Sequence, residues 1–429
     1  MYAAKCVLLW LAFPGLAAFG AESGALRAGA ARIDITPPAD ESLPMAGYAG
    51  RAPSKGVHDP IYVRAIVLDN GVTQSALVAW DLIFVPNGVW ADLSQRIAKE
   101  VGIPPEHLLL SAVHNHGAPS LGGGGDDAGT SPKTLAYTAK AEDAALEAVR
   151  RAKANLQPAR FGIGTGTAYV NINRRELTPA RGWWLGENPD GPSDKTVAVL
   201  KFEDLSGKPI AFFINYAVHG TIMGSHNYQI TGDLPGATSR YVERHFHDQA
   251  VAVWTSGAAG DQNPVSRENG EEFGMVDALG RLLGEEVMRV AAGIKPAWPQ
   301  VRIWGVQQVI ACPGRKVDPG PLPRKEYTFT DAAPVSIRLS LIMLNDVALT
   351  GVSGEVLTMI HQHLKKESPF SRTLMVTHTN GSSGYIPDDS AFNQVSYEIT
   401  TSHLKPGCAE NAIVNGFLGM MDQYGQAQK

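Results

Sequence analysis

The most constraining feature of this sequence is a strand–helix–strand unit whose second strand runs directly into a pair of histidines. Residues 75–85 form an apolar run that predicts a strand, and residues 88–102 have the amphipathic spacing of a helix that Gly102 can terminate. Residues 108–113 predict a second, buried strand, which leads into His114-Asn115-His116. This unit favours an α/β sheet, in which ligands bind near the carboxyl ends of the strands.

Further strand and helix patterns extend the unit into mixed sheets. Residues 31–38 alternate and predict a first strand, and 61–71 pair with 75–85 as a hairpin that turns at Asn70-Gly71. Strands are also predicted over two short parts of 159–175 and over 196–204, 209–220, 250–261, 336–344, 347–352 and 373–378, and helices over 133–154, 236–246, 271–292 and from near Glu355. The Pro-rich stretch 312–326 is typical of an insertion or lid. We predict α/β architecture: a single large domain with mixed β-sheets flanked by helices.

The N-terminus has the pattern of an export signal. Lys5 precedes an apolar stretch over 6–19, and Ala-Phe-Gly before Ala21 offers small residues for cleavage. The apolar stretch is shorter than the roughly 20 residues that span a bilayer. We therefore predict a signal peptide over 1–20 and an exported protein, periplasmic or secreted. Cys312 and Cys408 would remain after cleavage, and the sequence leaves open whether they pair.

Composition narrows the class of partner. Of the 429 residues, 44% are hydrophobic and 18% are charged, which is typical of a globular protein. The formal net charge of -5 gives no electrostatic reason to expect nucleic-acid binding.

Several polar residues follow apolar strands in the way that His114 does. They are His219, Asp261, Glu355 and His378, with Tyr385 a few residues beyond the last strand. If these strand ends converge, imidazole and carboxylate groups can hold zinc and leave one position for water. Each residue also has a purely structural interpretation. A histidine at a strand end can be structural, and Asp261 could cap the next turn. Glu355 could be an acid in the first turn of a helix, and Tyr385 could simply pack in the core. The sequence contains no P-loop motif, which disfavours a P-loop nucleotide-binding protein. It also contains no Gly-x-Ser-x-Gly elbow, which disfavours a serine hydrolase of that class.

Taken together, these motifs resemble the neutral (non-lysosomal) ceramidase family. The segments that carry the resemblance are SAVHNHGAPS, NINRR, NYAVHGTIM, TSGAAGDQNP, VSGEVLTM and NGSSGYIP followed by SYE. They occur in the family's order over residues 33–398. The resemblance implies a ceramidase-like zinc hydrolase domain, which we place over residues 26–425.

The resemblance also implies roles for individual residues. It places one zinc ion on His114, His219, Glu355 and Tyr385. It places His116 beside the reacting carbonyl and Arg174 on the substrate side.

The chain departs from the family pattern in two ways. The family's serine in Gly-Asp-x-Ser-Pro falls on Asn263, which cannot be a nucleophile, and Ser266 is the nearest alternative in sequence. The sequence given also does not continue into the C-terminal sandwich domain of true ceramidases. We therefore expect a substrate other than ceramide.

The resulting hypothesis is a zinc-dependent hydrolase that cleaves an amide (N-acyl) or related bond with zinc-bound water. His116 would transfer the proton, Asn263 would bind substrate or oxyanion, and Asp261 would orient a zinc-bound histidine. A small-molecule or lipid-like substrate is expected, and contact with a membrane surface stays open, as does the oligomeric state.

Other functions also stay open at this point. The same zinc site would serve an ester, lactone or glycoside hydrolase, with Trp183, Trp184 and Tyr48 available to line a sugar cleft. A relative that binds a ligand without turnover is a second alternative. A dinuclear His-x-His amidohydrolase is disfavoured, because the predicted hairpins contradict a regular eightfold βα barrel.

Overall fold

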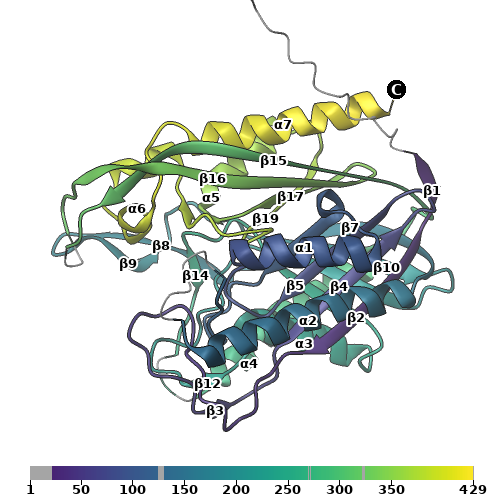
Figure 1. Cartoon of the computed structure of the whole chain (residues 1–429), viewed down its shortest axis with the longest axis horizontal. Helices are drawn as coiled ribbons and strands as arrows, with labels where there is room; N and C mark the ends of the chain where they lie inside the picture. Colours follow the sequence, from purple (N-terminus) through teal and green to yellow (C-terminus); the bar gives the residue numbers. More distant parts are fainter. Residues whose placement is uncertain (1–21, 124–129, 269, 271, 321–323, 429) are drawn as a thin grey trace, which may run out of the picture.

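The computed structural model describes residues 22–123, 130–268, 270, 272–320 and 324–428. The predicted signal peptide over 1–20 lies outside the described residues. The helices are α1 Asn87–Val101, α2 Pro132–Ala154, α3 Asp233–His245, α4 Gly274–Gly293, α5 Thr358–Glu367, α6 Tyr397–Thr401 and α7 Ala409–Ala427, with single turns of 3-10 helix at Pro105–His107 and Asp389–Asn393. Figure 1 shows their arrangement around the sheets.

The largest sheet has eight strands in the order β13-β11-β10-β7-β2-β4-β5-β6. Its strands are β2 Arg27–Asp34, β4 Tyr62–Asp69, β5 Gln74–Trp80, β6 Leu108–Ala112, β7 Gln157–Thr167, β10 Thr196–Asp204, β11 Pro209–Tyr216 and β13 Val251–Ser256. Hairpins make most neighbours antiparallel, but β5 pairs with β6, and β11 with β13, in parallel. The sheet is therefore mixed, as the sequence predicts.

A second sheet has the order β1-β15-β16-β17-β19. Its strands are β1 Ser23–Ala25, β15 Gln300–Val317, β16 Phe329–Leu344, β17 Val347–Val352 and β19 Arg372–Val376. Smaller pairings join β3 Gly56–Val57 to β12 Gln229–Ile230, β18 Glu355–Val356 to β20 Tyr385–Ile386, and β14 Gln262–Pro264 to the hairpin of β8 Asn171–Thr178 and β9 Gly182–Asn188. The last two groups carry residues of the candidate site.

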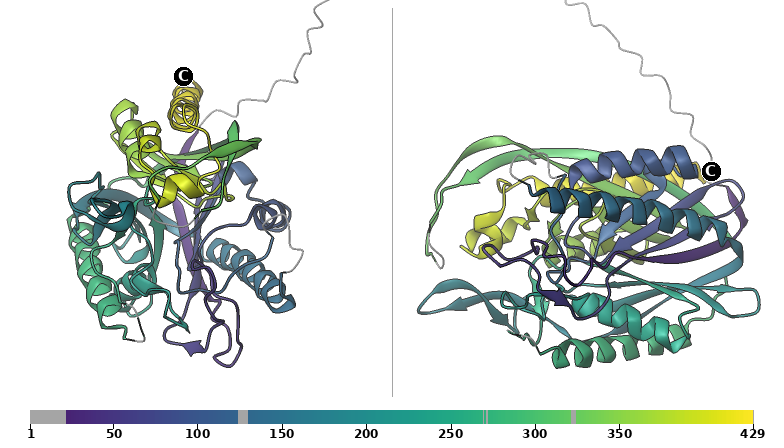
Figure 2. Two further views of the ribbon diagram at one scale, coloured as in Figure 1. Left: turned by 90° about the vertical axis from the view of Figure 1, so that its left-hand side faces the viewer. Right: turned by 60° about the horizontal axis from the view of Figure 1, so that its bottom comes forward.

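Alternating side chains pack the two sheets face to face. In β4, Ala65 and Val67 belong to the core beneath α1 and α2, whereas Ile66 and Leu68 share a core with Ile342 of the second sheet. In β16, Leu341 and Met343 turn the other way, toward α7. Because side chains alternate between the faces of a strand, helices, sheet, sheet and helices lie in successive layers (Figures 1 and 2).

Most of the predicted elements are present, with shifted ends. The hairpin β4–β5, the helices α1 and α2 and the hairpin β10–β11 match their patterns, and Gly102 has the left-handed φ of 80° expected of a C-cap. Glu355 is not a first-turn acid: it lies in β18, and α5 begins only at Thr358. The first half of the Pro-rich stretch is also not a loop, because β15 continues through Cys312 to Val317.

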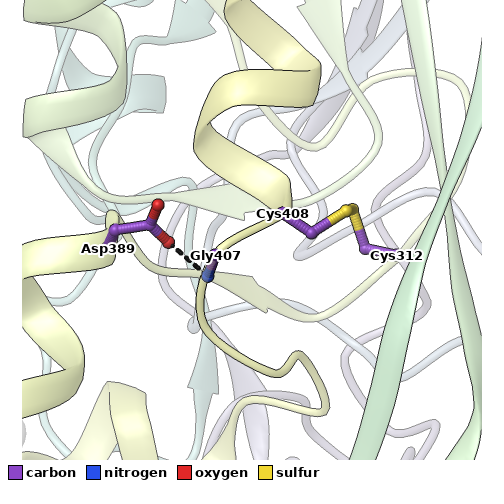
Figure 3. The surroundings of a disulfide bond; sticks show 4 residues. All are labelled: Cys312, Asp389, Gly407 and Cys408. Carbon is purple, nitrogen blue, oxygen red and sulfur yellow. Dashed lines mark hydrogen bonds between the residues drawn. A yellow bond between two sulfur atoms is a disulfide. The ribbon is translucent and has the colours of Figure 1, made fainter.

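Cys312 and Cys408 form a disulfide with sulfur atoms 2.05 Å apart. The bond ties β15 to the residue that precedes α7, and Asp389 accepts a hydrogen bond of 2.8 Å from the backbone of Gly407 beside it (Figure 3). The pairing that the sequence left open is therefore made.

None of the helices in the described ranges combines the length and the apolar character required to cross a membrane.

Candidate metal centre

The candidate site lies where parallel strands of both sheets end. His114 follows β6 and His219 follows β11, while His378 follows β19. Asn115 bridges to Gly220, and Ser111 bridges to Thr379, so the three strand ends are joined directly. His114 and His378 have φ of 59° and 53°, the left-handed region that bulky side chains rarely adopt. The fold thus holds these two histidines in turns that only the surrounding contacts can stabilise.

Three buried ligand atoms converge at this edge. Glu355 Oε1 lies 2.8 Å from His219 Nε2 and 3.3 Å from His114 Nε2. The parallel pairing of β18 with β20 sets Tyr385 directly beside Glu355. The structure therefore brings the four residues predicted to hold zinc to one place.

The tautomers of both histidines follow from their other ring nitrogen. His114 Nδ1 lies 2.9 Å from the carbonyl oxygen of Ile83, and His219 Nδ1 lies 2.9 Å from that of Gln262. A carbonyl can only accept, so each Nδ1 carries the proton and each Nε2 presents a lone pair. The same orientation by a backbone carbonyl is usual for metal-binding histidines.

This geometry fits a cation. Two imidazole lone pairs face Glu355 Oε1, a buried carboxylate oxygen that has no hydrogen-bond partner. Acceptors this close repel one another, and a cation bound between them would relieve that repulsion. Two histidines and a carboxylate form a set that zinc prefers. The buried clusters His114-His116-His219 and His114-Glu355-His378 each have the spacing of a metal site.

Burial and contacts among the site residues shift the pKa values of Glu355 and His219. Burial by itself would raise the pKa of Glu355, but the adjoining His114 and His219 outweigh burial and hold that pKa well below its usual value. Burial, helped by Arg174 and His114, lowers the pKa of His219 to about 3. At neutral pH the site therefore holds an ionised Glu355 carboxylate beside a neutral His219 imidazole.

His116 lies beside this cluster without belonging to its carboxylate contacts. Its Nε2 is 3.2 Å from His114 Nε2, and its buried Nδ1 has no partner. Gly47 closes over the ring at φ 93°, where a Cβ would meet His116 Nδ1 at 2.2 Å. Only glycine fits at that close approach.

Arg174 is fixed among the site residues from several sides. It donates to Glu398 at 2.6 Å, to Tyr385 at 2.8 Å and to His219 Nε2 at 2.9 Å. Burial would lower its pKa, but Tyr385, Glu398 and Glu355 together raise the pKa well above its usual value. Arg174 is thus a permanent buried cation at the edge of the site.

Asn263, at the position of the family's serine, and the nearby Asp261 have different contacts. Asn263 is buried, with Oδ1 3.5 Å from Arg174 Nη1. The Asp261 carboxylate accepts from Thr358 and from the side chains of Gln262 and Asn173. It is the carbonyl of Gln262 that orients His219, so the prediction that Asp261 orients a zinc-bound histidine is wrong. Asp261 instead anchors the loop that carries that carbonyl.

A cavity of about 230 Å³ opens onto this cluster. Its lining includes His114, His116, Glu355, His378 and Tyr385, with Tyr397 from α6. Asn263 and Ser266 are not among the described residues that line it.

Sequence reasoning assigned no role to three contributors. Glu398 anchors Arg174, Tyr397 packs its ring 5.8 Å from that of Tyr385, and His378 stacks on His114 with centroids 4.0 Å apart. His378 had a signal, since it ends an apolar strand as His114 does. Glu398 had only its place in the SYE segment, 224 residues from Arg174.

The fold and the site together define a mixed α/β protein with a buried His/Glu cluster at the strand ends that could hold a metal ion. The sequence model described as neutral/alkaline non-lysosomal ceramidase, N-terminal, matches residues 26–271. The chain belongs to this family.

Individual relatives agree. The chain is 27% identical to the neutral ceramidase of Drosophila pseudoobscura pseudoobscura over 60% of this chain and 38% of that protein. It is 29% identical to the neutral ceramidase of Pseudomonas aeruginosa over 61% of this chain and 39% of that protein. The matched part is thus about two fifths of these relatives' length.

Solved structures show the same fold. The crystal structure of the Pseudomonas aeruginosa neutral ceramidase superposes with a TM-score of 0.74 at 18% identity, covering 94% of this chain and 75% of that one. A ceramidase complexed with C2 gives the same TM-score over 92% of this chain and 74% of that one.

Proposed function

We propose that this chain is an exported, zinc-dependent hydrolase that cleaves the carbon–nitrogen bond of an N-acyl substrate. The observation that carries the proposal is the convergence of His114 Nε2, His219 Nε2 and the unpartnered Glu355 Oε1 beside a cavity. Membership of the ceramidase family supports the choice of an amide bond. The names of the relatives supply the bond class; the substrate itself is a separate question.

His114, His219 and Glu355 would hold one zinc ion, and Tyr385 is placed to complete the set. When bound there, zinc supplies a water of lowered pKa and polarises a carbonyl. Arg174 keeps the phenol of Tyr385 and the carboxylate of Glu355 in place through its 2.8 Å and 3.8 Å contacts.

His116 is the residue placed to move the proton. It lines the cavity, and its Nε2 lies 3.2 Å from His114 Nε2, on the side of the proposed metal ligands. In hydrolysis, water adds its oxygen to the carbonyl carbon, the carbon–nitrogen bond breaks, and the amine leaves with a proton. His116 would take that proton from water and return it to the nitrogen.

Asn263 is not placed to attack a carbonyl. Its amide oxygen faces Arg174 and its side chain does not reach the cavity lining. We propose that Asn263 helps to position Arg174, and that Ser266 does not replace the family's serine. Direct attack by water is then the simplest route.

Export is supported by two observations of different kinds. The first is the signal-like pattern over residues 1–20, and the second is the Cys312–Cys408 disulfide, since such bonds persist in oxidising compartments. We propose a periplasmic or secreted location.

A hydrolysis panel tests the bond class. The purified mature chain is assayed on matched amide, ester, lactone and glycoside substrates, with His114→Ala as the metal-site control. We expect turnover of amides above the others, and none in the control. The proposal would be contradicted if esters were hydrolysed as fast as amides. It would also be contradicted if an N-acyl compound bound without being hydrolysed.

A further inference from the structure

A second cavity, of about 490 Å³, lies apart from the metal centre between the β8–β9 hairpin and the connection from β15 to β16. Leu177, Pro179, Trp183 and Val395 contribute apolar wall, and Arg324 and Lys325 contribute two cations. Figures 1 and 2 show the hairpin and this connection at the same end of the molecule.

The register of the hairpin explains the apolar wall. Leu177 pairs directly with Trp183 across the two strands, and Glu176 pairs with Trp184. Directly paired residues share a face, so Leu177 and Trp183 face the cavity while Glu176 and Trp184 face away. Leu177 is 62% exposed, so most of its apolar surface is open to solvent. Arg181 stacks over Trp184 instead.

The described residues do not neutralise the two cations at the cavity. Arg324 donates Nη1 to the carbonyl of Asp318 at 2.9 Å, and its buried Nε has no partner. Within the described ranges, no carboxylate lies within salt-bridge distance of Arg324 or Lys325. Apolar wall and free positive charge together suit an anion attached to an alkyl chain.

The cavity shares two segments with the metal centre. Strand β8 carries Arg174 at the site and Leu177 in the cavity wall, about 10 Å apart at the rise of an extended strand. Val395 lies two residues before Tyr397, which lines the cavity at the metal. These shared segments place the second cavity within roughly the length of a medium alkyl chain of the metal centre.

From this arrangement we propose that the second cavity binds the far, anionic end of the substrate. The substrate is then an N-acyl amphiphile whose alkyl chain ends in a carboxylate or sulfate. The assignment to substrate rests on the proposed hydrolase function, whereas the ligand class of the cavity does not.

Calorimetric titration with decanoate tests the ligand class directly. It is done on the full mature protein carrying His114→Ala, and in parallel on chelated wild type, so that the metal centre does not bind the carboxylate. We expect one decanoate per chain, and at least tenfold weaker binding of decanol and of inorganic phosphate. Equal binding of decanol would overturn the role of the cations, and equal binding of phosphate would overturn the amphiphile.

Variants locate the binding. Arg324→Ala/Lys325→Ala and, separately, Trp183→Ala should each weaken decanoate at least tenfold. Trp184→Ala, the neighbour that faces away, is the matched control and should change affinity less than twofold. Decanoate binding that survives the Arg324/Lys325 change would overturn the proposal.

A kinetic arm tests the link to substrate. Two N-acyl amides that differ only in a terminal carboxylate or methyl group are compared, and the carboxylate is expected to lower KM about tenfold without changing kcat. The Arg324/Lys325 variant should remove that difference. If neither amide is hydrolysed while decanoate still binds, the hydrolase function and the substrate assignment fall, and the ligand class of the cavity stands.

Discussion

At the scale of single residues, the two histidines of the His-x-His segment have different surroundings. His114 donates Nδ1 to a backbone carbonyl and points Nε2 at Glu355, whereas His116 has an unpartnered Nδ1 beneath Gly47. Sequence spacing alone could not separate them. The carbonyl of Ile83, just beyond the neighbouring strand β5, sets the His114 tautomer that a metal ligand would need.

His116→Ala is expected to lower the hydrolysis rate by about 10²–10⁴, the usual loss of a general acid–base group, and to leave the bound metal in place. His219→Ala should lose both the metal and the activity. The measurement is zinc content alongside initial rate for each variant. Loss of zinc in the His116 variant would make His116 a ligand and contradict the assigned role.

Glu398→Ala is expected to destabilise the protein by roughly 3–5 kcal/mol, because it leaves the buried Arg174 cation without its 2.6 Å partner. Denaturant unfolding measures the change. Glu285→Ala removes an exposed ion pair with Arg281 and should change the unfolding free energy far less than Glu398→Ala does. A loss at Glu398 no larger than at Glu285 would show that Arg174 is held by its other contacts.

At the scale of elements, local periodicity predicted what is locally determined. The α1 and α2 helices and the β4–β5 hairpin have their own apolar spacing and turn residues, so their patterns sufficed. The local pattern of β15 did not predict a strand there, because Pro313 and Gly314 are typical of a loop. Pairing with β16, through a register shift at Cys312/Gly314, overrides that local preference.

Helix α2 carries a carboxylate that should make stability depend on pH. Burial, with added repulsion from Asp92, raises the pKa of Glu142 to about 7. The folded state therefore binds the extra proton between about pH 4.5 and pH 7, and stability falls as the pH rises through that window.

Glu142→Gln should remove this fall. Relative to wild type, the variant is expected to gain stability as pH rises, by on the order of 1 kcal/mol above pH 7 after allowance for partial exposure, with the difference vanishing near pH 4. Unfolding curves across pH measure it. Glu147→Gln, on the same helix but paired with Arg151, is the control and should show no such trend. A pH-independent difference at Glu142 would rule the mechanism out.

At the scale of the whole molecule, the site depends on both sheets. His114 and His219 come from the eight-stranded sheet, and Glu355 follows a strand of the other sheet. The sequence could predict that these strand ends carry ligands, and the family resemblance supplied their grouping. It could not show how the sheets stack, because that depends on contacts between residues far apart in the chain.

The disulfide should add to global stability. It links residues 96 apart, and closing a loop of this length restricts the unfolded chain by about 4–5 kcal/mol in the chain-entropy view. Reduction is expected to lower the unfolding free energy by several kcal/mol, and Cys312→Ala/Cys408→Ala should match the reduced protein. If reduction leaves the denaturant midpoint unchanged, the bond contributes nothing to stability.

The most direct test of the central claim is the zinc content of the purified mature protein, measured before and after chelation together with hydrolysis of an N-acyl amide. The account predicts about one zinc per chain, loss of both zinc and activity on chelation, and recovery of both when zinc is returned. A folded protein that contains no zinc, takes up none, and hydrolyses the amide equally well in chelator would contradict it.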